Sequence, residues 1–198
     1  MRSFLSLSLA PLAAAAALWA APAAALNWRI APAESQITFA YTENGEPAEG
    51  RFKRFGGVGE FDRARPQRAR LDLEIAVDSI ELSNGFRTSF VKTETWFDAE
   101  SHPTAHFILD EIRLDPSAGE PEVGETARYA VVGRLRIKGV ERPVETAIDL
   151  TLDARRARAV GAVTFERSAF GVGDRIGGLF VDLSDAITVQ FDIVANRL

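Results

Sequence analysis

The chain has 198 residues, of which 26% are charged and 46% apolar, as is ordinary for one globular domain. It contains no cysteine, which excludes a disulfide framework, thiol catalysis, covalent haem and a cysteine-based zinc site. A formal net charge of −5 without a basic tract argues against a nucleic-acid partner.

Residues 1–25 have the features of a secretory signal peptide. Arg2 precedes an Ala-rich apolar run that is short for a membrane span, and Ala23, Ala24 and Ala25 fit the small-residue cleavage rule. We therefore expect cleavage before Leu26, a periplasmic location and one domain over residues 26–198. The alternative is an uncleaved N-terminal anchor.

The remaining sequence is dominated by alternation of apolar and polar residues, which is typical of strands with one buried face. In chain order the segments with this pattern, or shorter candidates for it, are 37–41, 52–61, 71–77, 105–114, 129–137, 144–152, 159–165, 179–183 and 187–195. Lys138-Gly139 lies between two of them and predicts a hairpin. Eight or nine strands are expected in an all-β domain.

Helical periodicity is weak everywhere. The best segment is 85–95, where Phe86 and Phe90 are four residues apart, but its threonines are poor helix formers. At most a short helix or an irregular crossover is expected. Strands with one apolar face must close it in a two-sheet sandwich or a barrel, and sequential hairpins favour the barrel. Its interior is either packed solid or holds one small ligand, and the pattern leaves both open.

Residues 94–106 look at first like an active site, because they contain three acids and both histidines of the chain. However, Pro103 lies between His102 and His106, and the second histidine begins a strand candidate. Residues four apart on a strand are separated by about 13 Å, too far to share a metal ion. Asp98 is more simply a turn residue. No catalytic residue and no metal site are expected; an exported small-substrate hydrolase or isomerase that uses this segment is the alternative function.

Several motifs occur in an informative order. They are SQITF at 35–39, WFD at 96–98, GRLRIKGVERPV at 133–144 and RSAFG at 167–171. In this order the sequence resembles the YceI-like family of periplasmic polyisoprenoid-binding proteins, over nearly all of the chain that follows the leader.

The resemblance implies a lipocalin-like antiparallel β-barrel of about eight strands with a short helical crossover. It also implies an amphiphile with an isoprenoid tail, of quinone or polyprenyl phosphate type, held non-covalently in an apolar tunnel for carriage, storage or stress protection. No catalysis and no cofactor other than that lipid are implied. Transient membrane contact for lipid exchange and a homodimer stay open, as does a structural β-protein with a filled core.

The expected ligand-binding residues are aromatic side chains on the strands and the crossover, with two arginines for a polar head. They are Phe39, Tyr41, Phe52, Phe86, Arg87, Phe90, Trp96, Phe97, Phe107, Arg167 and Phe170. For Arg167 the alternative is a structural hydrogen bond that fixes the turn after it.

One segment departs from the family it resembles. Relatives often carry Arg-Asp-x-His-Leu ahead of the aromatic-Asp segment, whereas this chain has RTSFV at 87–91. Thr88 and Phe90 therefore replace an Asp and a His, and this difference predicts an altered ligand preference.

Overall fold

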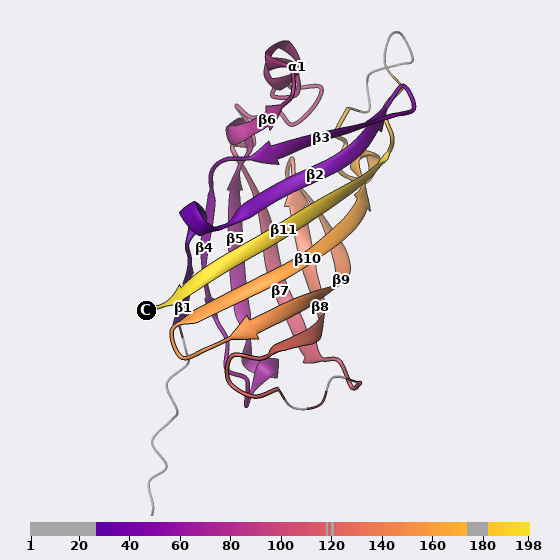
Figure 1. The fold of residues 1–198 in the computed structure, drawn as a ribbon. Helices are drawn as coiled ribbons and strands as arrows, with labels where there is room; N and C mark the ends of the chain where they lie inside the picture. Colours follow the sequence, from indigo (N-terminus) through magenta and orange to yellow (C-terminus); the bar gives the residue numbers. More distant parts are fainter. Residues whose placement is uncertain (1–26, 118, 120, 174–181) are drawn as a thin grey trace, which may run out of the picture.

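Figure 1 shows the computed structural model, which describes residues 27–117, 119, 121–173 and 182–198. The predicted leader, residues 1–25, lies outside the described residues, as do residues 179–181 of one predicted strand. The strands are β1 Asn27–Ile30, β2 Gln36–Glu43, β3 Glu46–Phe52, β4 Phe55–Glu60, β5 Arg70–Ala76, β6 Ile80–Leu82, β7 Thr104–Leu114, β8 Thr126–Ile137, β9 Val140–Leu152, β10 Arg156–Glu166 and β11 Ala186–Arg197. The helix α1 spans Gly85–Phe90, and short 3-10 turns are η1 Pro32–Glu34, η2 Pro66–Arg68, η3 Val77–Ser79 and η4 Arg167–Phe170. No helix in the described part is long and apolar enough to cross a bilayer.

The strands form a closed antiparallel barrel. Hydrogen bonding runs in the order β1-β4-β5-β7-β8-β9-β10-β11, and β11 pairs back onto β1, with Trp28 opposite Arg197. The ring therefore has eight members, and the predicted barrel is confirmed in place of the sandwich. The last strand bends over a long path, so its first half pairs with β2 while its end pairs with β1.

Three strands of the wall are broken, and the breaks shape one end of the barrel. β1 continues as β2 after η1, β3 as β4 after residues 53–54, and β5 as β6 after η3. The single strand predicted over 52–61 is thus two short strands. Beyond the last break β6 pairs with β3, and no pairing of β6 with β7 occurs among the described residues. α1 lies beyond β6 at this end (Figure 1), which we call the lid end together with residues 91–103.

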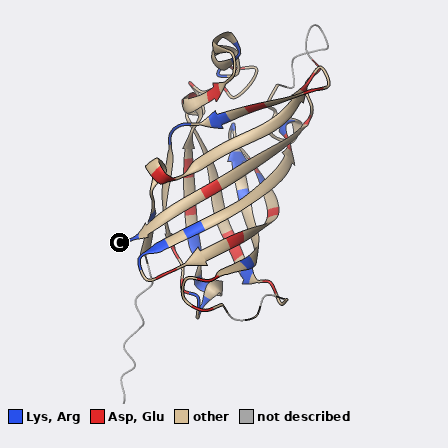
Figure 2. Cartoon of the chain, in the orientation of Figure 1, with Lys and Arg blue, Asp and Glu red and all other residues tan. Residues whose placement is uncertain are grey.

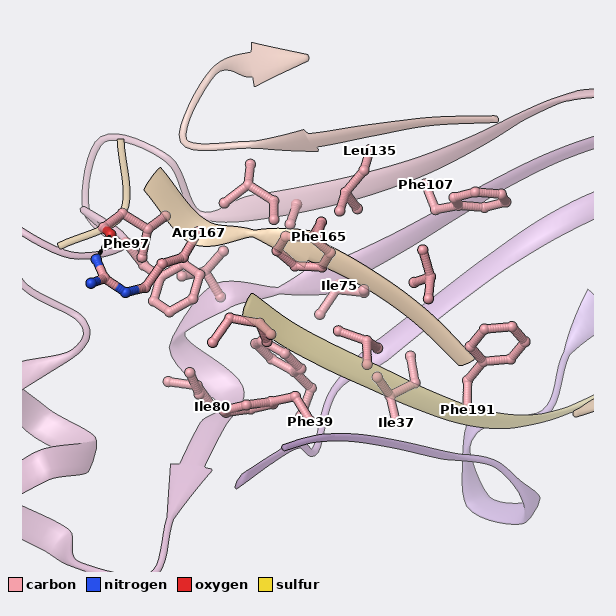
Figure 3. Close-up of a pocket in the computed structure, with 18 of the residues that line it drawn as sticks. Ile37, Phe39, Ile75, Ile80, Phe97, Phe107, Leu135, Phe165, Arg167 and Phe191 are labelled. Atoms are coloured by element: carbon pink, nitrogen blue, oxygen red, sulfur yellow. Dashed lines mark hydrogen bonds between the residues drawn. The ribbon is translucent and has the colours of Figure 1, made fainter. Parts of the chain in front are cut away.

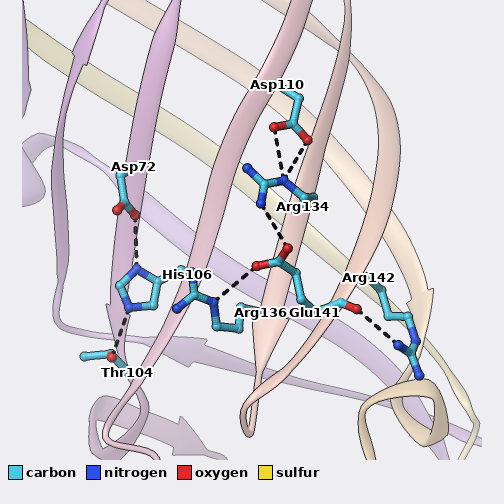
Figure 4. A network of polar contacts seen from close by, with 8 residues as sticks. All are labelled: Asp72, Thr104, His106, Asp110, Arg134, Arg136, Glu141 and Arg142. Atoms are coloured by element: carbon cyan, nitrogen blue, oxygen red, sulfur yellow. Dashed lines mark hydrogen bonds and ion pairs between the residues drawn. The ribbon is translucent and has the colours of Figure 1, made fainter.

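Side-chain alternation sorts the wall into an apolar inside and a charged outside. Along β10 every second residue is exposed, from Arg156 to Glu166. Figure 2 shows residues of both charge signs distributed along the strands of the wall. Many of these charges pair across neighbouring strands, as where Arg134 contacts Asp110 at 3.0 Å and Glu141 at 3.0 Å (Figure 4). The polar outer face and apolar inner face follow from the period of two.

The β8–β9 hairpin turns at Lys138 and Gly139, as predicted. Both residues have positive φ, 51° and 76°, the conformation that a tight two-residue hairpin needs. The Lys138 ammonium group donates to the carbonyl oxygens of Glu94 at 2.7 Å and Gly171 at 3.2 Å. This turn therefore ties the segment after α1 to the turn that follows β10.

Two adjacent glycines in β4 give a matched test of the register. A Cβ at Gly57 would lie 2.3 Å from the carbonyl oxygen of Asp72 on β5, whereas a Cβ at Gly56 meets nothing within 4 Å. Gly57→Ala is expected to destabilise the protein by about 1–3 kcal/mol, because backbone must move. Gly56→Ala is expected to be neutral or to stabilise by up to about 1 kcal/mol. Urea unfolding measures both, and equal effects would contradict the register.

Candidate functional site

The barrel encloses an elongated cavity of about 460 Å³, within the range of about 300–1,000 Å³ that small-molecule sites occupy. Figure 3 shows part of its wall, where Ile37, Ile75, Leu135, Phe107 and Phe191 border the same space from different strands. Aliphatic and aromatic side chains form most of the wall. The interior is therefore not packed solid, which answers the question that the sequence left open.

The cavity follows the strands over much of their length. On β11 it is lined by alternate residues from Ile187 to Ile193, a span of roughly 20 Å at about 3.3 Å per residue. At the end opposite the lid, Phe61 and Tyr129 pack edge to face with centroids 6.0 Å apart. They belong to a second buried cluster, which forms the floor of the cavity.

Polar side chains on the cavity wall gather at the lid end. Only Thr146 lies elsewhere among the described lining residues, and its hydroxyl donates to the Ala162 carbonyl oxygen at 2.5 Å. The polar and charged lining residues at the lid end are Tyr41, Glu43, Arg87, Arg167 and Ser184. An amphiphile in this cavity would thus find an apolar depth and a polar opening.

An ion pair crosses the lid end. Arg87 on α1 pairs with Glu43 at the end of β2, and the Glu43 side chain is only 11% exposed. Burial raises the pKa of the Tyr41 phenol, Glu43 raises it further, and Arg87 lowers it. The pair therefore connects the short helix to the barrel rim and places a carboxylate and a guanidinium beside the cavity.

Arg167 lies at the same end, at the start of η4. Its Nε donates to the Ser184 carbonyl oxygen at 3.2 Å and its Nη1 to the Val172 carbonyl oxygen at 2.8 Å. Its Cζ lies 5.9 Å from the centroid of the Trp96 ring, within the range of a cation–π contact. The structural role considered for Arg167 is present, and the same side chain lines the cavity.

The Trp96 side chain carries an unsatisfied donor. It is 7% exposed and its Nε1 has no hydrogen-bond partner in the described structure. By contrast, Trp28 Nε1 donates to the Phe61 carbonyl oxygen at 3.2 Å. A buried donor without a partner costs about 1–3 kcal/mol, so the Trp96 indole leaves a local destabilisation at the lid end of the barrel.

A family model for the YceI-like domain matches residues 28–195, which is most of the chain. The chain belongs to the YceI-like family. A UPF0312 protein of Azotobacter vinelandii is 24% identical over 147 residues, covering 71% of this chain and 72% of that protein. One of Photorhabdus laumondii is 29% identical over 95 residues, which are 48% of this chain and only 44% of the relative's length.

Solved structures agree with the YceI-like fold. Burkholderia cenocepacia BcnA is 26% identical, with a TM-score of 0.71, over 83% of this chain and 98% of that one. A polyisoprenoid binding domain from Saccharophagus degradans, implicated in plant cell wall breakdown, has a TM-score of 0.70 at 16% identity, over 87% of this chain and 99% of that one. At this identity the second likeness concerns the fold alone.

Of the eleven residues that the sequence suggested for ligand binding, ten border the cavity of the YceI-like barrel. They are Phe39, Tyr41, Phe52, Phe86, Arg87, Phe90, Trp96, Phe97, Phe107 and Arg167. Phe170 is the exception: it is 1% exposed, absent from the cavity wall, and packs edge-on against Phe165 at 5.3 Å between centroids. Contact of the ten residues with a ligand stays a prediction.

Most of the wall was missed from the sequence. Isoleucine, leucine and valine residues on every second strand position form it, and their alternation was the available signal. Glu43 was also missed, because an acid beside a turn looks like an ordinary surface residue. Phe165 lines the cavity from β10, although it was not among the predicted residues. Phe170, which was predicted, lies in the turn that follows this strand.

The acid and histidine segment does not assemble into a site. Glu94, Asp98, His102 and His106 are all absent from the cavity wall. Asp98 is a turn residue with φ 48°. The His102 ring lies against the β8–β9 hairpin, where a Cβ at Gly139 would come within 3.2 Å of it.

His106 points outward from β7 instead. Its Nδ1 lies 3.0 Å from Asp72 Oδ1 and its Nε2 3.1 Å from Thr104 Oγ1 (Figure 4). Asp72, Glu74 and His106 form a group whose potential ligand atoms lie within 4.8 Å of one another. This outer grouping was not predicted, because it depends on cross-strand pairing. It is separate from the cavity, and exposed acids of this kind are common without a metal.

Proposed function

We propose that this protein binds a lipid with a prenyl chain, non-covalently, inside the barrel. The observation that carries the proposal is the apolar cavity, roughly 20 Å long by strand geometry, with its charged side chains at one end. An extended residue spans about 3.5 Å with three backbone atoms, and an isoprene unit has four chain atoms, so an extended unit is about one third longer than a residue. Roughly four isoprene units therefore fit along the cavity. The polyisoprenoid-binding neighbour from Saccharophagus supports the choice of this lipid class.

The polar head is proposed to lie at the lid end. Arg87 and Arg167 border the cavity there, together with the Tyr41 hydroxyl. Guanidinium groups form charge-assisted hydrogen bonds with phosphate and with carbonyl oxygens. A quinone or a polyprenyl phosphate therefore suits this end, while the tail occupies the depth near the floor.

The protein is proposed to act outside the cytoplasm, by carriage, storage or protection of the lipid, without turnover. Residues 1–25 support export, because Arg2, the apolar run and Ala23–Ala25 have the order of a signal peptide. Burial favours a prenyl chain by about 0.8 kcal/mol per methylene-sized group, so a closed barrel can shield it in an aqueous compartment. Exchange of such a lipid requires a transient contact with a membrane.

The test is to isolate the protein from the periplasmic extract of its own host and analyse it by native mass spectrometry. A bound amphiphile with prenyl-type fragments is expected. The intact mass of the polypeptide is expected to match a chain that begins at Leu26. Size-exclusion chromatography with light scattering on the same sample tests the homodimer. Absence of any bound amphiphile, together with failure to take up quinones and prenyl phosphates from detergent, would overturn the proposal.

A further inference from the structure

The helix α1 exposes two aromatic rings. Phe86 is 79% exposed and Phe90 is 44% exposed, and among the described residues these are the two most exposed aromatic side chains. Their positions four residues apart place them on one helix face. The rings stack with centroids 6.3 Å apart and an angle of 8° between planes. We call this pair the Phe86–Phe90 face.

This face is continuous with the cavity. Both residues also line the cavity at its rim. Phe90 packs edge-on against Trp96, with centroids 6.1 Å apart, and Trp96 is a buried wall residue. An unbroken apolar surface thus runs from the interior of the barrel to the outside of α1. Other exposed large apolar residues, such as Val58 and Val123, do not border the cavity.

The helix is also held in place by contacts that do not involve the two rings. Asn84 Oδ1 accepts from the backbone N–H groups of Phe86 at 2.9 Å and Arg87 at 3.4 Å, which caps the first turn. Val91, 9% exposed, anchors the other end in the core. In Figure 1 the helix projects beyond β6 at the lid end. The face is therefore presented to the outside by a separately fixed element, and exposed apolar surface of this kind marks a docking site.

We propose that the Phe86–Phe90 face docks on the surface of a lipid bilayer, with both rings inserted at the headgroup boundary. The occupant follows from the continuity of the surface: an apolar chain that enters the barrel passes these rings, so what covers them must itself be apolar. This rests on the proposed function, since a prenyl lipid is stored in a membrane. Aromatic rings at this depth favour interfacial binding.

Charge contributes little to this docking. Arg87 is paired with Glu43, and Glu81 accepts ion pairs from Arg51 and Lys53 at 2.5 Å each. The rim thus offers few unpaired cations to anionic headgroups, and binding to vesicles is expected to depend weakly on salt concentration. Strong salt dependence would instead indicate an electrostatic surface.

A fluorescent reporter tests insertion directly. Phe86→Trp places an indole at the proposed contact, and Val123→Trp places one at a site of similar exposure, 76%, that the proposal leaves in water. All variants are isolated from the same host, so the N-terminal segment is common to them. With phosphatidylcholine vesicles that contain no prenyl lipid, the Phe86→Trp indole is expected to shift to shorter wavelength and the Val123→Trp indole to stay unchanged. Equal responses would overturn the proposal.

A loss-of-contact pair complements the reporter. The Phe86→Ser/Phe90→Ser double variant is expected to bind the same vesicles at least about tenfold more weakly in a flotation assay, a difference of 1.4 kcal/mol. The matched control is Val123→Ser/Val160→Thr, at sites 76% and 39% exposed, which is expected to bind like the parent. Circular dichroism checks that both variants are folded. Unchanged flotation of the first variant would contradict docking on a bilayer. Conversion of this variant from a dimer to a monomer would also contradict it, and would indicate that another copy of the chain covers the face.

These measurements separate the docking from the proposed function, because the vesicles lack prenyl lipid. Vesicle binding that depends on the two rings, in a protein that takes up no prenyl lipid, would support the docking and overturn the proposed function. If the protein took up prenyl lipid but its vesicle binding did not depend on the two rings, the proposed function would be supported and the docking overturned.

Discussion

Replacing Ala159 with phenylalanine is expected to weaken the binding of long prenyl chains by about 10²–10³-fold. Ala159 lines the cavity from β10, opposite Ile193 in the register. It also packs against the buried cluster that forms the floor. A phenyl ring here would occupy about the space of one isoprene unit. The end of a long chain would then remain in water, at a cost of about 0.8 kcal/mol for each of its carbons.

The effect is expected to depend on chain length, which separates it from general damage. Prenols that do not reach the floor should bind Ala159→Phe within about threefold of the parent, equivalent to less than 1 kcal/mol. Ala162→Phe is the control, because Ala162 lies three residues along the same strand and is exposed on the outer face. Competition titrations with prenols of graded length make the comparison. A uniform loss at all lengths, or an equal loss in the control, would contradict the tail-to-floor orientation.

Much of the barrel could be predicted from local sequence, because a strand with one solvent-exposed face has alternating polar and apolar residues. The segments 129–137 and 144–152, with Lys138-Gly139 between them, correspond to β8, β9 and their hairpin. The four-residue β1 and the three-residue β6 are too short to show a period. Closure of the barrel depends on pairing between opposite ends of the chain, at Trp28 and Arg197, and no local pattern contains that information.

The site was predictable in part, for a related reason. Alternation tells which residues face inward, but it does not tell whether the space across from them is filled or empty. The aromatic predictions were placed by size and by resemblance, and most of them border the cavity. Phe170 does not border the cavity, because it lies in η4, a 3-10 turn that interrupts the alternation still holding for Phe165. The aliphatic wall was missed because inward Ile37 or Leu135 looks the same in a solid core.

Phe170→Ala is expected to cost about 3–5 kcal/mol of the free energy of unfolding, the range for buried Phe-to-Ala replacements. The side chain is 1% exposed and belongs to the main core cluster. For a domain of this size the corresponding fall in melting temperature is about 10–15 °C. Phe86→Ala, at a site 79% exposed, provides the matched control and should change stability by less than about 0.5 kcal/mol. Urea and thermal unfolding measure both variants.

The same substitution also tests what holds the polar end of the cavity together. Phe170 ends the 3-10 turn that begins with Arg167, and it is followed by Gly171 in the left-handed conformation at φ 67°. Without the phenyl anchor, the turn loses the packing that fixes the Arg167 guanidinium beside Trp96. Phe170→Leu keeps most of the buried volume, so it should restore stability and head-group affinity together. If the leucine variant recovered stability but not affinity for a prenyl phosphate, Phe170 would have to contact the ligand, against its place behind the wall.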